Sequence, residues 1–468
     1  MRHQSSRLAP RDGASSRGAR WLPRLNAPIL VAVFLAVGSG QRGLCAETGR
    51  VPNIVLIMAD DLGYGDLGCF GQREIETPQI DKLAAEGVRF TDHYSGSAVC
   101  APSRCVLMTG LHTGHCYIRN NRPLPFEGNV PIPADSQTIA KLLRQAGYAT
   151  ACVGKWGLGY PGSEGDPIKQ GFDLFFGYNC QRQAHSYYPP HLWRNDEKVI
   201  LEGNLDGKQT QYSHDLLTAE ALDFIRGHHA RPFFLYVPYT IPHLQFQVPE
   251  LGRYADKPWS ENHKIQAAMI SRMDRDVGRI VDLLGELGVD ENTLVIFTSD
   301  NGPHGSGGTL EQFGAAGPLR AKKGSLYEGG IRVPMVARWP GKIKPGTTSD
   351  LVSGFQDMLP TFAELASLAV PKPTDGISFV PTLLGQPDQK EHEYLYWEFG
   401  SQRAVRLGHF KAVQSGAEKN PAGPIDLFDL AEDLGEQKNV AADHPEIIEK
   451  VRAVMNESHT YSEFFDLE

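Results

Sequence analysis

The stretch that decides the fold is residues 53–61, which read NIVLIMADD. A run of apolar residues from Ile54 to Ala59 leads directly into two carboxylates, Asp60 and Asp61. An uninterrupted apolar run of this length predicts a strand that is buried on both faces, as in a parallel sheet. Ligands of such sheets bind beyond the carboxyl ends of the strands. Asp60 and Asp61 are therefore candidate site residues.

Helical and extended patterns alternate after this strand. The predicted elements are a helix from Thr77 and Pro78 to Gly87, a helix capped by Ser136 and stopped by Gly147, a strand over Tyr148 to Val153, a helix near His214 to Ile225, a strand over Phe233 to Val237, a helix over about Ile265 to Leu287 and a strand over Thr293 to Thr298. This alternation predicts an α/β fold with a large, mainly parallel sheet flanked by helices on both faces.

The pattern changes from about Pro387. Aromatic, alternating segments over Tyr394 to Phe399 and Ala404 to Val413 precede a helical segment over Pro445 to Asn456. We expect a smaller α+β subdomain over residues 387–468, after a catalytic domain over residues 47–386.

The first 46 residues are typical of an export signal. An arginine-rich segment up to Arg24 precedes the apolar run Ala27 to Val37, and a small-residue cleavage site ends at Ala46. Eleven apolar residues are too few for a membrane-spanning helix, which needs about 20. We expect a cleaved signal peptide, no integral membrane span after its removal and a periplasmic or secreted protein. Lipid attachment at Cys45 is the alternative.

Charge and cysteine content exclude two classes of function. The chain carries −9, and the leader has seven arginines and one acid, so the remainder carries −15. A chain this acidic repels nucleic acid, so we expect no nucleic-acid partner. The six cysteines after Cys45 include no C-x-x-C pair, which disfavours structural zinc, whereas one or two disulfides are compatible with export.

More polar residues stand where predicted strands end. Lys155 closes the second strand, His243 follows the third after a short turn, and Asp300 and Asn301 follow the fourth. Asp60, Asp61, Asp300 and Asn301 offer hard oxygen donors, which suit calcium or magnesium. Without a cation, the adjacent carboxylates would repel one another.

The segment Cys100-Ala101-Pro102-Ser103-Arg104 is the sharpest local signal. Pro102 suits the first position of a helix that stops at Gly110, so Cys100 is expected at a helix amino terminus. Unpaired amides and the helix dipole favour an anion there, and Arg104 can reach back to orient it.

This motif in its context resembles the type I sulfatases of the alkaline phosphatase superfamily. The resemblance extends over most of the mature chain and is carried by ordered blocks: Pro52 to Gly65, Cys100 to Gly114, Gly154 to Gly159, Pro242-His243, Thr298 to Gly302, Gly317 to Gly324 ending in Glu328-Gly329-Gly330, and Leu427 to Leu430.

The resemblance implies a role for each matched residue. Cys100 becomes 3-oxoalanine (formylglycine), made by a formylglycine-generating or sulfatase-modifying enzyme, and the hydrate of this aldehyde is the nucleophile. Calcium is the usual ion, with magnesium as an option, held by Asp60, Asp61, Asp300 and Asn301 next to Cys100. Lys155 and Lys323 hold the sulfate, Arg104 belongs to the modification motif, and His243 protonates the leaving oxygen.

One position departs from the family pattern. Gly157 stands where the family commonly has a histidine that acts as base on the formylglycine hydroxyl. His112, His115 and His185 are candidates to replace it. The loop from Arg182 to Arg194 is rich in aromatic and basic residues, so we expect Arg182 and His185 to contact substrate.

The predicted activity is hydrolysis of sulfate monoesters, with a sulfated carbohydrate, another sulfated small molecule or an aryl sulfate as substrate and inorganic sulfate as product. Two alternatives remain. One is a phosphate or phosphonate monoester hydrolase of the same superfamily, and the other is an inactive relative that binds sulfated glycans, suggested by Gly157.

Overall fold

The apolar run over residues 53–59 forms β1 (Asn53–Ala59), an inner strand of a ten-stranded sheet. The computed structural model describes residues 51–465. The sheet order is β11-β2-β10-β9-β1-β8-β4-β5-β6-β7. The other strands of this sheet are β2 (Val88–Phe90), β4 (Ala149–Lys155), β5 (Leu174–Tyr178), β6 (His191–Arg194), β7 (Glu197–Ile200), β8 (Phe233–Pro238), β9 (Thr293–Ser299), β10 (Met335–Arg338) and β11 (Thr347–Ser349).

The centre of the sheet is parallel and its outer strands are mixed. Strands β9, β1, β8, β4 and β5 run in the same direction. β10 and the β6–β7 hairpin are antiparallel to their neighbours, whereas β11 pairs parallel with β2. The predicted α/β class and mainly parallel sheet are confirmed, and the antiparallel strands are additions to the prediction.

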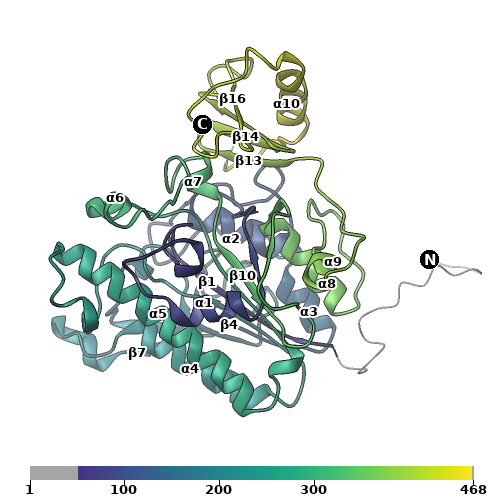
Figure 1. The fold of residues 1–468 in the computed structure, drawn as a ribbon. Helices are drawn as coiled ribbons and strands as arrows, with labels where there is room; N and C mark the ends of the chain where they lie inside the picture. Colours follow the sequence, from purple (N-terminus) through teal and green to yellow (C-terminus); the bar gives the residue numbers. More distant parts are fainter. Residues whose placement is uncertain (1–50, 466–468) are drawn as a thin grey trace, which may run out of the picture. The chain divides into compact units, whose positions relative to one another are not determined.

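Alternate residues of β1 point into different cores, which is why the whole run is apolar. Val55, Ile57 and Ala59 pack with helices α1 (Pro78–Ala85), α4 (Ser213–His228) and α5 (Glu261–Glu286). Ile54, Leu56 and Met58 pack on the opposite face with α2 (Cys100–Thr109), α3 (Ile139–Gln145) and α8 (Met358–Leu365). Figure 1 shows helices on both sides of the strands.

Of the two predicted helix starts, the one at Ser136 is wrong and the one at Thr77 and Pro78 is confirmed. Thr138, not Ser136, is the N-cap of α3, and its side chain accepts a hydrogen bond from the Lys141 amide. Thr77 is in the N-cap position of α1, but its hydroxyl makes no capping bond. It accepts from the Gly68 amide and donates to Asp81 instead.

The segment after residue 387 contains a second, antiparallel sheet of four strands in the order β13-β14-β15-β16. These are β13 (Leu395–Phe399), β14 (Gln402–Leu407), β15 (Phe410–Ser415) and β16 (Asp426–Asp429). Val451 and Met455 of α10 (Pro445–Glu457) pack against Val405 and Ala412 of this sheet. This is the expected α+β composition, while the boundary between residues 386 and 387 stays a prediction.

The remaining elements are short and connect the larger ones. They include α6 (Thr309–Phe313), α7 (Glu328–Ile331), α9 (Val380–Leu383) and the strand pair β3 (His93–Tyr94) and β12 (Ser353–Gly354).

The predicted signal peptide and Cys45 lie outside the described residues. Within residues 51–465 all six cysteines are free thiols, and no helix is long and apolar enough to span a membrane.

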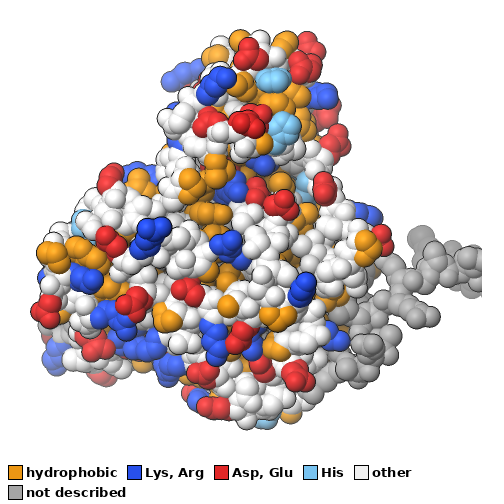
Figure 2. Space-filling view, in the orientation of Figure 1, with side chains coloured by type: hydrophobic (Ala, Val, Ile, Leu, Met, Phe, Trp, Pro, Cys, Tyr) orange, Lys and Arg blue, Asp and Glu red, His pale blue; other side chains and the backbone are white. Residues whose placement is uncertain are grey.

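The visible surface carries both signs of charge. Figure 2 shows acidic and basic side chains interspersed over the face that is drawn, with hydrophobic side chains scattered between them.

Candidate active site

The predicted polar residues meet at one edge of the sheet. Asp60 and Asp61 follow β1, Asp300 and Asn301 follow β9, and Lys155 is the last residue of β4. Because β9, β1, β8 and β4 are successive parallel neighbours, their carboxyl ends lie together. The fold therefore brings together, in one buried cluster, residues such as Asp61 and Asn301 that are 240 positions apart in sequence.

Cys100 is the first residue of α2 and is buried, with 2% of its surface exposed. Its Sγ lies 3.4 Å from Asp60 Oδ1 and 3.6 Å from Lys323 Nζ. The expectation that Pro102 starts this helix is wrong, because α2 begins two residues earlier, at Cys100 itself. Burial and the Asp60 charge raise the pKa of the Cys100 thiol well above its usual range, so an unmodified thiol here is a poor nucleophile.

Three cations are interleaved with the carboxylates. Lys155 Nζ donates to Asp60 Oδ2 at 2.6 Å, and Lys323 Nζ lies 2.7 Å from Asp61 Oδ1. Arg104 Nη2 donates to Asp300 Oδ2 at 2.6 Å, and its Nη1 donates to the carbonyl of Lys155.

The carboxylates differ in how well their charge is compensated. Burial opposes ionisation of Asp60, but Lys155, His243 and Arg104 hold its pKa far below the usual value. Burial and the neighbouring charge of Asp60 raise the pKa of Asp300 to about 6, despite the contact with Arg104. Asp300 is therefore the carboxylate whose ionisation gains most from an additional positive charge.

The residues present fit a divalent cation. Asp60, Asp61, Cys100 and His243 place one donor atom each within 4.8 Å of one another. Asn301 donates to Asp61 Oδ1 at 2.8 Å, while its own buried Oδ1 has no hydrogen-bond partner. A set made mainly of carboxylate and amide oxygens suits a hard ion such as calcium or magnesium.

His243 is oriented by its neighbours. Its Nδ1 contacts the carbonyl oxygen of Leu244, which can only accept, so Nδ1 carries the hydrogen. Nε2 then faces Asp61 Oδ2 at 3.5 Å. Burial lowers the pKa of His243, although Asp61 and Asp60 act in the opposite direction.

Two further histidines lie close to His243. The exposed ring of His185 stacks on His243 with centroids 4.5 Å apart, and the ring of His304 lies 6.2 Å away. His304 was missed by sequence reasoning; its position four residues after Asp300 was the available signal. Arg182 is exposed and donates to the carbonyl of Phe126 at 2.8 Å, so its guanidinium is partly engaged by the protein itself.

The three histidines proposed to replace a base at Gly157 fall into different places. His185 joins the cluster through His243, as described above. His112 and His115 instead stack on each other at 4.1 Å and face Asp375, which His115 Nδ1 contacts at 3.0 Å. The structure thus groups His112 and His115 with Asp375 and not with Cys100.

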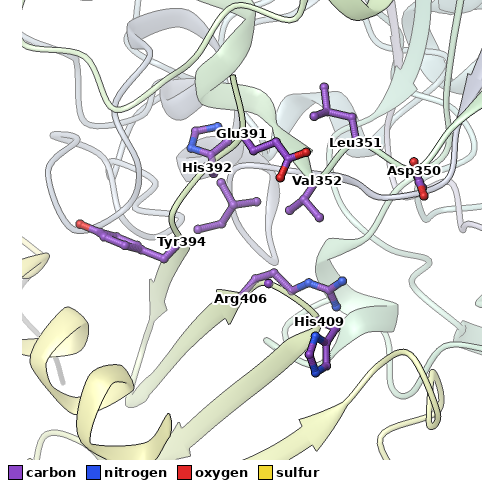
Figure 3. Close-up of a pocket in the computed structure, with 10 residues that line it drawn as sticks. Asp350, Leu351, Val352, Glu391, His392, Tyr394, Arg406 and His409 are labelled. Atoms are coloured by element: carbon purple, nitrogen blue, oxygen red, sulfur yellow. The ribbon is translucent and has the colours of Figure 1, made fainter. Parts of the chain in front are cut away.

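A separate cavity of about 310 Å³ opens beside the C-terminal sheet (Figure 3). Its labelled polar side chains are those of Asp350, Glu391, His392, Tyr394, Arg406 and His409. All of its lining residues differ from those predicted for catalysis.

The chain is similar to known proteins over most of its length. The Sulfatase family model matches residues 52–368, and the model of the N-sulphoglucosamine sulphohydrolase C-terminal region matches residues 321–461. The chain is 34% identical to arylsulfatase A of Homo sapiens over 90% of this chain and 89% of that protein. It is 36% identical to N-acetylgalactosamine-6-sulfatase of Mus musculus over 82% of this chain and 75% of that protein. The solved structure of Ps i-CgsB in complex with k-i-k-neocarrahexaose has a TM-score of 0.76 and 32% identity, covering 87% of this chain and 93% of that chain.

Proposed function

This chain belongs to the sulfatase family and hydrolyses sulfate esters, and we propose that Cys100, oxidised to formylglycine, supplies the nucleophile. The observation that carries the proposal is the position of Cys100. It starts α2, and its side chain lies between Asp60 and Lys323 in the buried cluster. Family members use this modification with a divalent metal, and the oxidation would be made by a formylglycine-generating or sulfatase-modifying enzyme.

Each neighbouring group has a proposed task. Asp60, Asp61, Asp300 and Asn301 would hold the cation, for which we propose calcium. When bound, such an ion polarises a sulfate oxygen and lowers the pKa of a nearby hydroxyl. Lys155 and Lys323 offset the charge of the sulfate group as it reacts. Arg104 positions Asp300 and the carbonyl of Lys155 rather than touching substrate.

His243 is the proposed general acid. Attack on sulfur by a hydroxyl of the hydrated aldehyde would release the proton of that hydroxyl to solvent and break the bond between sulfur and the leaving oxygen. His243, protonated on both ring nitrogens for this step, would give the leaving oxygen the proton on Nε2. Once the second hydroxyl on the same carbon loses its proton, the bond between that carbon and the sulfate oxygen would break, which would release sulfate and restore the aldehyde. A thiol at position 100 has no such second hydroxyl. Modification of Cys100 is thus required for turnover as well as for attack.

The proposed substrate is a sulfated carbohydrate. An N-acetylgalactosamine-6-sulfatase and a structure with a bound neocarrahexaose are among the similar proteins. His185, which is exposed and stacks on His243, and the exposed Arg182 of the same loop are the residues that we propose contact sugar groups near the sulfate. We also propose that the leader exports the protein to the periplasm or the medium.

Two measurements test the nucleophile together. Mass spectrometry of the peptide that contains Cys100 should show conversion of thiol to aldehyde, and Cys100→Ala should abolish sulfate release. Cys69→Ala, which changes a partly buried cysteine in a different segment, is the matched control and should retain activity. Unchanged activity in Cys100→Ala would remove the proposed mechanism.

A comparison of kcat/KM on an aryl sulfate and on the matching aryl phosphate tests the class of ester. We expect a clear preference for the sulfate. A preference for the phosphate would favour a phosphate or phosphonate monoester hydrolase. Binding of a sulfated glycan without sulfate release, by protein with confirmed aldehyde, would indicate an inactive relative.

A further inference from the structure

Gly157 has no room for a side chain. Its φ of +81° is one that residues with a Cβ rarely adopt. A Cβ built on it would lie 2.1 Å from Gln181 Nε2 and 3.0 Å from Gln181 Cδ. The carboxamide of Gln181 therefore occupies the space into which any side chain at position 157 would project.

The amides around Gly157 are buried without partners. Gln181 is 6% exposed and Asn179 1% exposed, and both polar atoms of each side chain lack a hydrogen bond. Nδ2 of Asn129 also lacks a hydrogen-bond partner, while Oδ1 of Asn129 accepts a hydrogen bond from the backbone N–H of Gln181 at 2.9 Å. A buried polar group without a partner costs about 1–3 kcal/mol, so a cluster of them indicates a polar group that completes the bonding.

The main chain at Gly157 is tied to the reacting centre. Lys155, two residues earlier, bonds to Asp60, the carboxylate that Cys100 contacts. The Gly157 amide donates to the carbonyl of Asn179 at 3.0 Å, which joins this segment to the end of β5. Gln181 and Asn179 thus stand on the same sheet edge as Lys155.

We propose that Gln181 is a positioning residue that takes up the side-chain space at Gly157 and holds a hydroxyl of the oxidised Cys100 side chain by hydrogen bonding. This inference rests on the proposed function. A carboxamide both donates and accepts hydrogen bonds but takes no proton at neutral pH, unlike an imidazole. Asn179 and Asn129 keep the Gln181 segment in place from the other side.

Gln181→Ala should lower kcat about 100-fold, the usual effect of removing one positioned hydrogen-bonding group, while KM changes little. Gln183→Ala is the matched control, because Gln183 lies two residues away and its side chain bonds to the carbonyl of His191. It should keep wild-type kcat. Aldehyde content and thermal unfolding are measured for each variant, so a loss of modification or folding is recognised.

A double-mutant cycle separates this role from a structural one. Gly157→Ala should displace Gln181 and cost as much kcat as Gln181→Ala, and the double variant should lose no more than either single variant. Losses that multiply, or a Gln181→Ala enzyme with wild-type kcat, would overturn the inference. A wild-type enzyme with confirmed aldehyde that releases no sulfate would instead overturn the proposed function.

Discussion

Lys323 lies between Cys100, the proposed nucleophile position, and Asp61, a proposed metal ligand. Its Nζ lies 2.7 Å from Asp61 Oδ1 and 3.6 Å from the Cys100 sulfur, and the charges of Asp61 and Asp60 raise the pKa of Lys323 against the effect of burial. The side chain stays charged throughout the pH range of an assay. Lys323→Ala should lower kcat/KM for an aryl sulfate about 100-fold, through both a higher KM and a lower kcat.

The neighbour of Lys323 provides the control for this measurement. Lys322 is exposed and carries the same charge. Lys322→Ala should retain wild-type kcat/KM, which excludes a general effect of net charge. Equal losses in the two variants would show that Lys323 acts only through the overall field.

Occupation of the oxygen cluster should be visible in stability as well as in activity. Calcium at 100 times its dissociation constant adds about 2.7 kcal/mol to the free energy of unfolding, since the unfolded chain has no such site. A chelator should therefore lower Tm and stop sulfate release, and calcium should restore both. In Asp300→Asn, which removes a carboxylate from the cluster, calcium should shift Tm much less than in the wild type.

At the residue scale, sequence reasoning finds the charged groups and misses the amides. Asp60, Lys155 and Asp300 are conspicuous because each follows an apolar strand. Gln181 and Asn179 carry no such signal, because an amide outside a regular element is usually a turn residue. Their importance comes from burial and from the missing side chain at Gly157, which only the packed structure shows.

At the element scale, the type of each helix and strand follows from periodicity, but its first residue depends on competing caps. Ser136 and Thr138 are both good N-cap residues. Thr138 is the cap because its hydroxyl can also donate to the carbonyl of Gln170, 32 residues along the chain. The same limit applies to α2, where Pro102 suits any position of the first turn and so does not fix the start of the helix.

The segment before α8 contains a titratable contact with a predictable pH dependence. Asp357 accepts from the amides of Gly354 and Ile377, and His392 Nε2 lies 2.7 Å from its Oδ1. Burial alone would lower the pKa of His392, but the charge of Asp357 and this contact raise it above the usual value. A histidine with a raised pKa in the folded state stabilises the fold fully below about pH 6.5, and this stabilisation is lost as pH rises through the folded pKa.

Replacement by a neutral side chain isolates this contribution. In His392→Gln, an amide can still donate to Asp357, but the side chain at position 392 no longer titrates. Thermal unfolding is measured between about pH 5.5 and 8.5, the range in which histidines usually titrate. Over this range, the Tm of His392→Gln should fall less with rising pH than the Tm of the wild type. His409→Gln, at an exposed histidine, should keep the wild-type slope. Identical slopes in all three proteins would contradict the assignment.

At the scale of the whole molecule, the parallel centre is predictable and the sheet edges are not. β1 and its two neighbours, β8 and β9, are buried strands with largely apolar sequences. Such runs are typical of parallel strands, so this part of the sheet can be predicted from the sequence. β10 and the β6–β7 hairpin are short, and their direction is set by the strands with which they pair. Neither strand order nor these antiparallel pairings can be derived from local patterns.

A buried ion network joins the C-terminal sheet to the segment that carries Lys323. Lys411 of β15 is fully buried; its Nζ donates to Glu328 Oε1 at 3.0 Å and lies 3.6 Å from Glu436 Oε1. Glu328 begins α7, five residues after Lys323, and also accepts from Tyr94 and Arg332. The catalytic segment and the C-terminal sheet therefore depend on the same charges.

Lys411→Met keeps the length of the side chain but leaves Glu328 and Glu436 buried with one cation fewer. Breaking a buried pair in this way costs about 3–5 kcal/mol, so the urea midpoint should fall sharply and sulfate release should fall with it. Adding Glu436→Gln to Lys411→Met removes one of the uncompensated charges and should recover part of the loss. Lys419→Met, at a side chain that is 88% exposed, should change the midpoint little. If Lys411→Met unfolded at the same urea midpoint as the wild type, the ion network would not stabilise the contact between the C-terminal sheet and the segment that carries Lys323.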